Sequence, residues 1–347
     1  RGQGATWVWI VSSCTMRPVS TPHAFVIPSA LVDPEDSAFV QALAGMRLPH
    51  LSALLARSRV QRSPEHPAQR LSTVHEWAQA QAWGWTPTDG LLPWAAMRAQ
   101  ALGLDTAGEQ AWAVFTLCHW HVAQGQITMA SPALLSVTDA ESDDLRLAMQ
   151  AYCEQDGIQL HPDGPGQWLA ASELFRDLPT ASMDRVVGHA VEDWWAGAGI
   201  SQPSEAAQHL RRLQNEMQML LYQHPVNDQR SLQGKWTVNS FWVHRQVDQL
   251  YVSTLPAQIH FDLKEASLLS HAAQWRAQWE HLDRTVCKDL VDAMAANKDI
   301  SLTLCSLHAW RHYRLQKRSV LNALMRAFSP TSVQKELGAL LKDAPTP

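Results

Sequence analysis

The chain has 347 residues, with 28 Lys and Arg against 33 Asp and Glu, so its formal net charge is −5 with the 16 His counted as neutral. Hydrophobic residues make up 46% and charged residues 18%, a globular composition that excludes a disordered chain. The mild acidity argues against a protein built around a nucleic-acid-binding face. The longest apolar run, residues 5–11 with one Thr inside it, is far shorter than the roughly 20 residues of a membrane-spanning helix.

The cysteines indicate a reduced, cytoplasmic setting. There are five, widely spaced and without a CxxC motif, so neither a disulfide framework nor a zinc ribbon is expected. Four of them are predicted to be small buried hydrophobic residues. The apolar stretch within residues 1–22 is too short for a signal peptide. We therefore interpret these residues as an extension outside the fold. Residues 331–347 are expected to form a C-terminal helix and a frayed tail.

Strands and helices alternate along the chain, which favours an α/β fold with a central mixed sheet flanked by helices. In the first part of the chain we expect a strand at 23–28, a helix from Asp33 or Asp36 to about 59, a polar loop at 58–69, and helices at 71–83 and 93–102. The middle part should contain strands at 111–121 and 126–130, a helix at 138–154, strands at 158–161 and 167–170, and a helix at 204–222. The last part should contain strands at 238–243 and 250–255, one or two helices within 263–294, strands at 301–305 and 310–315, and a basic helix from about 317.

The helix expected at 204–222 has the clearest pattern, because Leu210, Leu213 and Met217 recur on one face. Thr138 with Glu141 has the spacing of a capping box. No internal repeat is visible. We therefore expect one domain over 23–330, with 197–203 as the best candidate hinge.

Two histidines, His119 and His121, are candidate metal ligands. Side chains alternate along a strand, so both imidazoles would share one face of the strand expected at 111–121. A divalent metal held there would need carboxylates from elsewhere in the chain. The alternative is a pair of structural, hydrogen-bonded histidines at a strand end.

Asp184 and Arg185 lie in a dense run of small and charged residues at 180–188. Arg185 is a candidate for binding a phosphate or carboxylate, with Asp184 holding it in place. The alternative is an N-capped helical turn with a surface ion pair.

A second group of candidates follows the 204–222 helix. The amides of Gln214 and Gln218 share a helix face, which indicates either a polar pocket wall or hydrogen bonds to neighbouring backbone. Candidate ligand-binding residues also lie in the turn after the helix and at the opening of the next strand, where ligands bind in many α/β folds: His224, Asn227, Asp228, Asn239 and Ser240. A basic cluster at 311–326 is interpreted as a solvated surface.

The segments TASMDRVVG (180–188), LRRLQNEMQMLLY followed by HP and ND (210–228), and VNSFW (238–242) resemble the proteobacterial RpfE-type regulatory proteins, which are often described as cofactor-independent phosphoglycerate mutase-like. The resemblance extends from His23 to about Phe328 and includes LPHLSALL at 48–55. It implies a distant relation to the alkaline-phosphatase superfamily and a reduced core of that type. Active members use two divalent metals and a Ser or Thr nucleophile.

The chain departs from that superfamily pattern at the catalytic positions. Ser29 stands roughly where a nucleophile would, yet no metal-binding Asp precedes it and no Asp-His-Gly triplet occurs. Two-metal phosphoryl transfer needs such ligands to hold the attacking and leaving oxygens. The sequence therefore favours a catalytically degenerate regulatory or ligand-binding protein, whose partner is a small phosphorylated ligand or another protein. One alternative is a metal-dependent phosphomutase or phosphohydrolase with a rearranged site; another is an interaction subunit with Trp-rich surfaces.

Overall fold

The computed structural model describes residues 23–30, 37–62, 69–108, 110–123, 125–245, 257–306 and 308–315. The contacts within these ranges divide the chain into two compact units. Unit 1 contains the described residues within 70–73 and 87–245, and unit 2 contains those within 23–69, 74–86 and 257–315.

This division differs from the single domain that the sequence favours. The chain passes between the units several times, so no single linker marks the boundary in the sequence. The candidate hinge at 197–203 lies inside unit 1. The expected extension at 1–22, the strand at 250–255, the basic helix from 317 and the tail at 331–347 lie outside the described residues.

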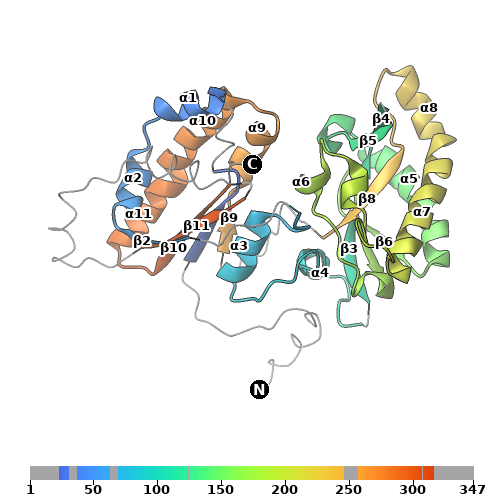
Figure 1. Cartoon of the computed structure of the whole chain (residues 1–347), viewed down its shortest axis with the longest axis horizontal. Coiled ribbons are helices and arrows are strands. Elements are labelled where there is room, and N and C mark those ends of the chain that lie inside the picture. Colours follow the sequence, from blue (N-terminus) through green and yellow to red (C-terminus); the bar gives the residue numbers. More distant parts are fainter. Residues whose placement is uncertain are drawn as a thin grey trace. The chain divides into compact units, whose positions relative to one another are not determined.

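Unit 2 is built on a mixed five-stranded sheet with the strand order β2-β11-β10-β1-β9 (Figure 1). Strand β1 runs parallel to β10 and β9, whereas β10, β11 and β2 are antiparallel neighbours. The elements of unit 2 are β1 (His23–Ile27), α1 (Ser37–Ala44), α2 (Pro49–Leu55), β2 (Ser58–Arg62), α3 (Val74–Ala82), β9 (Ala257–Ile259), the 3-10 turn η4 (Phe261–Leu263), α9 (Lys264–Leu268), α10 (Ala272–Leu282), the π-helical turn η5 (Asp283–Cys287), α11 (Lys288–Ala295), β10 (Ile300–Cys305) and β11 (Trp310–Leu315).

The side chains of this sheet alternate between two apolar layers, as a sheet covered on both faces requires. Ile27 and Leu302 pack with α1, α2, α10 and α11. Val26 and Cys305 face the other way and pack with α3. A mixed sheet flanked by helices is therefore confirmed.

Two expected elements of unit 2 differ in the structure. The long helix up to residue 59 is interrupted, because α1 ends at Ala44 and α2 begins at Pro49. A glycine at 45 and a proline at 49 account for the break, since both disfavour a helix interior. The polar loop expected from residue 58 instead begins with the strand β2, which pairs with β11. That pairing joins segments about 250 residues apart, so local sequence patterns do not reveal it.

Unit 1 is built on an antiparallel four-stranded sheet with the order β6-β7-β3-β8 and a separate two-stranded ribbon of β4 and β5. Its elements are α4 (Trp94–Ala101), β3 (Ala111–Cys118), β4 (Trp120–Ala123), β5 (Gln126–Met129), η1 (Pro132–Leu135), α5 (Asp139–Gln155), β6 (Gln159–Pro162), β7 (Gln167–Ser172), η2 (Glu173–Phe175), α6 (Met183–Val186), η3 (Val191–Trp194), α7 (Glu205–Tyr222), α8 (Pro225–Leu232) and β8 (Ser240–His244).

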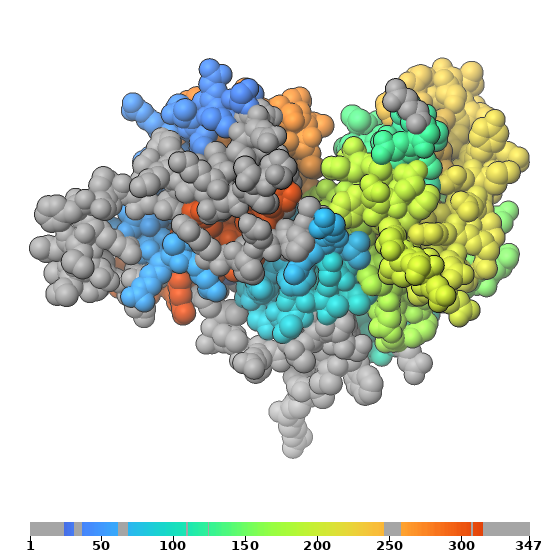
Figure 2. All heavy atoms as spheres, viewed as in Figure 1, coloured from blue at the N-terminus to red at the C-terminus, as the bar shows by residue number. Residues whose placement is uncertain are grey.

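Helices cover both faces of this sheet as well. Phe115 on β3 faces α5 and α7, whereas the residue before it, Val114, points to the opposite face of the sheet and packs with α4. The amphipathic stripe predicted for α7 is buried, and the predicted capping box of α5 is present at Thr138 and Glu141. The space-filling view shows α7 and α8, in yellow, at the surface of unit 1 (Figure 2). None of the helices in the described ranges is long and apolar enough to span a membrane.

Candidate functional site

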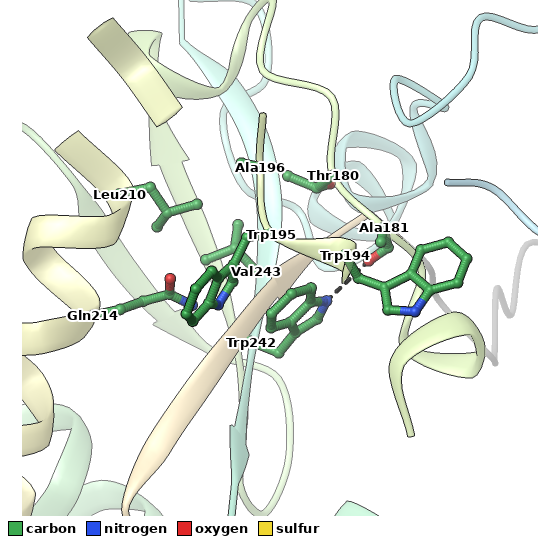
Figure 3. Close-up of a pocket in the computed structure, with 9 residues that line it drawn as sticks. All are labelled: Thr180, Ala181, Trp194, Trp195, Ala196, Leu210, Gln214, Trp242 and Val243. Atoms are coloured by element: carbon green, nitrogen blue, oxygen red, sulfur yellow. Dashed lines mark hydrogen bonds between the residues drawn. The ribbon is translucent and has the colours of Figure 1, made fainter. Parts of the chain in front are cut away.

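A small pocket in unit 1 lies between β8, α7 and the loops before α6 and after η3 (Figure 3). Three indole rings, Trp194, Trp195 and Trp242, form much of its wall. Trp242 is fixed on β8, because its Nε1 donates a hydrogen bond to the carbonyl of Ala181 at 2.9 Å. The remaining lining residues are Thr180, Ala181, Ala196, Leu210, Gln214 and Val243.

Two polar atoms in the lining of this pocket are buried and have no hydrogen-bond partner in the described part of the chain: Oγ1 of Thr180 and Nε1 of Trp195. A buried polar atom without a partner costs about 1–3 kcal/mol, which a ligand or an ordered water could recover. Gln214 lines the same space, and its Nε2 donates to the carbonyl of Phe241 at 3.2 Å. The sequence left open whether this amide forms a pocket wall or bonds to backbone, and Gln214 does both.

Gly90 positions the loop that carries Thr180. The amide of Thr180 donates to the carbonyl of Gly90 at 3.1 Å. Gly90 has a φ of +70°, and a Cβ there would lie 2.9 Å from the Thr180 nitrogen and 2.8 Å from Cδ1 of Leu71. A glycine is needed at this position both for its backbone conformation and for this close approach.

Arg211 on α7 places a positive charge against Trp195, one of the lining tryptophans. Its guanidinium carbon lies 5.3 Å from the centroid of the Trp195 ring, within the range of a cation–π contact. Nη2 of Arg211 donates to the carbonyl of Ala196 at 3.4 Å, while its Nε is buried and has no hydrogen-bond partner among the described residues. Arg211 thus contacts one of the lining tryptophans without itself lining the pocket.

The space inside the pocket is small. Its volume is about 10 Å³, close to what one water molecule needs. Sites for drug-sized ligands are much larger, roughly 300–1,000 Å³. In this conformation the pocket can admit a terminal group, and a larger ligand requires the tryptophan side chains to move.

The two candidate metal ligands lie in different surroundings. The expected strand at 111–121 is broken at His119, which lies between β3 and β4, so the premise that both histidines share one strand is wrong. His119 Nδ1 is 2.8 Å from the carbonyl of Thr237, and its ring packs edge-on against Trp236. His121 is exposed on the ribbon opposite Thr128.

Arg185 is nearly buried in the short helix α6, with 9% of its surface exposed. Its Nη2 donates to the carbonyl of Ser72 at 3.2 Å, which ties α6 to residues 70–73. Asp184 precedes it and is half-buried. The proposed anion-binding role of this pair stays a prediction.

The turn at 224–228 is held together by its own side chains. His224 caps α8, and its Nδ1 accepts a hydrogen bond from the amide of Val226 at 3.3 Å. Asn227 is buried and makes three bonds: Nδ2 donates to the carbonyls of Leu221 and Val238, both at 2.7 Å, and Oδ1 accepts from the Val238 amide at 2.8 Å. Asp228 is exposed.

Asn239 closes the break between β3 and β4. Its Oδ1 accepts from the amide of Trp120 at 2.7 Å, and its Nδ2 donates to the carbonyl of the same residue at 2.9 Å. Ser240 is fully buried opposite Cys118, and its side chain interacts with the Cys118 thiol. The side-chain amide of Asn239 thus replaces, at Trp120, the backbone pairing that is lost between β3 and β4.

Ser29 follows β1 and adopts a φ of +52°, a strained conformation for a residue with a side chain. Its carbonyl accepts a hydrogen bond from Nε1 of Trp275 at 3.0 Å, and the carbonyl of Ala30 accepts one from Nε1 of Trp279 at 3.0 Å. Helix α10 therefore fixes the end of β1. These hydrogen bonds involve backbone carbonyls and not the Ser29 hydroxyl, so the nucleophile at Ser29 stays a prediction.

Within the ranges that the structure describes, no three His, Cys, Asp or Glu side chains come together to hold a metal ion. These residues therefore do not fit the two-metal set used by active members of the alkaline-phosphatase superfamily. The four described cysteines are free and buried, as predicted for four of the five: Cys118, Cys153, Cys287 and Cys305. Burial raises the pKa of Cys153 to about 12 and that of the other three higher still, so their reactive thiolate forms are scarce at neutral pH.

Two buried charged residues that sequence patterns do not single out each join separate segments, Arg230 in unit 1 and Asp283 in unit 2. Arg230 on α8 donates to the carbonyls of Trp236 and Leu135 and to the Glu141 carboxylate, which also belongs to the capping box. Asp283 in the π-helical turn accepts hydrogen bonds from the Leu51 amide at 2.8 Å and from His50. Most of their partners lie far away in the chain: Leu135 and Glu141 for Arg230, and His50 and Leu51 for Asp283.

No protein-family model matches the sequence, and no curated protein matches it. Among solved structures, the chain is similar to cofactor-independent phosphoglycerate mutase from Thermoplasma acidophilum, with a TM-score of 0.35, 13% identity, and coverage of 92% of this chain and 100% of that one. It is also similar to a protein from Pyrococcus horikoshii, with a TM-score of 0.41, 11% identity, and coverage of 94% and 99%. Both TM-scores are below 0.5, so the fold class follows from the chain's own sheets and helices. The resemblance to RpfE-type proteins stays a prediction.

Proposed function

We propose that the protein is a cytoplasmic regulatory protein that binds a small phosphorylated ligand at the tryptophan pocket of unit 1 and does not itself transfer the phosphoryl group. The observation that carries the proposal is that some buried polar side chains are hydrogen-bonded within the protein and others are not. The side-chain amides of Asn227 and Asn239 form hydrogen bonds with backbone groups. Thr180 and Trp195 present buried polar atoms without protein partners in the described ranges.

The chemistry of the pocket supports a ligand with one anionic group and a small polar terminus. Arg211 supplies the charge, with its Nε still able to donate a hydrogen bond. The hydroxyl of Thr180 and the indole N–H of Trp195 are the groups that would bond to the terminus. The choice of a phosphorylated ligand rests on the resemblance found in the sequence.

The test uses 3-phosphoglycerate as the probe, together with an assay for its turnover. We expect the probe to raise the melting temperature of the wild-type protein in the presence of EDTA. The Arg211→Ala variant should lose this shift, because it removes the cation at the pocket. Arg212→Ala is the matched control, since Arg212 is the next residue on α7 and 57% of its side chain is exposed to solvent.

The alternatives give different results in the same experiment. Formation of 2-phosphoglycerate or release of phosphate in the presence of manganese or zinc would contradict the proposal and favour the metal-dependent enzyme. A folded wild-type protein that shows no shift with the probe would also contradict it and favour the interaction subunit. Equal losses in the Arg211 and Arg212 variants would indicate nonspecific charge attraction.

A further inference from the structure

Strand β2 forms one edge of the sheet in unit 2. Its inner edge pairs with β11, and no other strand of the described chain pairs with its outer edge. Its middle residues are exposed: Arg59, Gln61 and Val60, the last with 45% of its surface accessible. An exposed edge strand presents backbone N–H and C=O groups to which another strand can add.

The edge carries an unbalanced positive charge. Arg59 lies directly opposite Arg314 in the register of β2 and β11, and like charges at directly opposite positions repel. Arg314 forms an ion pair with Asp299 at a long 3.4 Å, and both of these side chains are about half exposed or more. Arg57, just before the strand, is exposed as well.

The positive charges of Arg57 and Arg59 determine which kind of strand can pair with the outer edge of β2. A second copy of β2 would bring the same arginines against the edge, so pairing between two copies is disfavoured. A strand with a carboxylate opposite Arg59 would instead place opposite charges side by side. Its neighbouring residues would point to the other face, where Val60 offers an apolar contact.

We propose that the outer edge of β2 binds an extended acidic segment of a partner protein, which adds to the sheet as a strand with alternating acidic and apolar residues. The main-chain hydrogen bonds of β2 supply the affinity, and Arg59, Arg57 and Val60 supply the selectivity. This surface belongs to unit 2, whereas the tryptophan pocket belongs to unit 1.

The test uses a fluorescein-labelled peptide of eight residues in which Glu and Val alternate. We expect the peptide to bind the full chain, and an alternating Lys and Val peptide not to bind. Arg59→Glu should weaken binding at least tenfold. Arg284→Glu is the matched control, because Arg284 is exposed on another element of the same unit and changes the net charge equally; we expect less than a twofold effect.

Hydrogen exchange distinguishes strand addition from simple charge attraction. Strand addition should slow amide exchange within residues 59–61 when the peptide is present. Equal weakening by the two substitutions, or equal binding of a peptide with the four Glu and four Val in separate blocks, would overturn the proposal. Equally tight, Arg59-dependent binding of a thymidine oligonucleotide would also overturn it, because it would indicate a general polyanion surface. Arg59→Lys should retain binding, and circular dichroism of each variant checks that the fold is intact.

Discussion

Replacing Asn227 with alanine distinguishes a structural role from a ligand-binding role for the 224–228 turn. The side chain is 5% exposed and makes three hydrogen bonds, two to carbonyls and one from an amide. Each such bond contributes about 1 kcal/mol net, so their loss should lower the free energy of unfolding by about 3 kcal/mol. For a unit of this size, that change corresponds to a fall of about 6–12 °C in melting temperature.

Urea denaturation followed by circular dichroism measures this change. Asp228→Ala is the control, because Asp228 is the next residue and is exposed, so its substitution should change the free energy of unfolding by less than about 0.5 kcal/mol. The reasoning is refuted if Asn227→Ala is as stable as Asp228→Ala. A loss of 3-phosphoglycerate binding in Asn227→Ala without a loss of stability would instead assign the turn to a ligand site.

Three further predictions concern stability. Arg230→Met should cost about 3–5 kcal/mol in urea denaturation, because Arg230 is fully buried and its removal leaves Glu141 without its cation; an unchanged midpoint would contradict this. Gly90→Ala should cost at least about 1 kcal/mol, since the positive φ and the nearby Thr180 nitrogen both oppose a Cβ; a variant of wild-type stability would show that the loop adjusts. Burial lowers the pKa of His161, His260 and His312 in the folded state, so the unfolded state takes up protons first and stability should fall as the pH drops below about 6.5; melting temperatures that stay constant between pH 7.5 and 5.5 would contradict this.

Features with a local cause could be predicted from the sequence. The 18-residue helix α7 has a buried stripe at helical spacing, and the structure buries Leu210, Leu213 and Met217 as expected. The capping box at Thr138 and Glu141 depends on two side chains three residues apart, and it is present. Such patterns succeed because the interactions that stabilise them are close in the chain.

Features that depend on distant partners were missed. Strand β2 exists because β11 pairs with it, and its own polar sequence indicates a loop. The break at His119 depends on Asn239, which bonds to both backbone groups of Trp120 from more than 100 residues away. The amides of Asn227 and Asn239 bond to backbone groups in the fold, and the pocket is assembled from four separate segments.

Isothermal titration of 3-phosphoglycerate into EDTA-treated protein tests most directly whether unit 1 binds its ligand at the tryptophan pocket without a metal. We predict saturable binding by the wild-type protein that is lost in Thr180→Val, a substitution of similar size that removes the buried hydroxyl, and retained in the double variant His119→Ala and His121→Ala. Binding that requires added manganese or zinc and disappears in the double histidine variant would contradict the account and return the site to the two histidines.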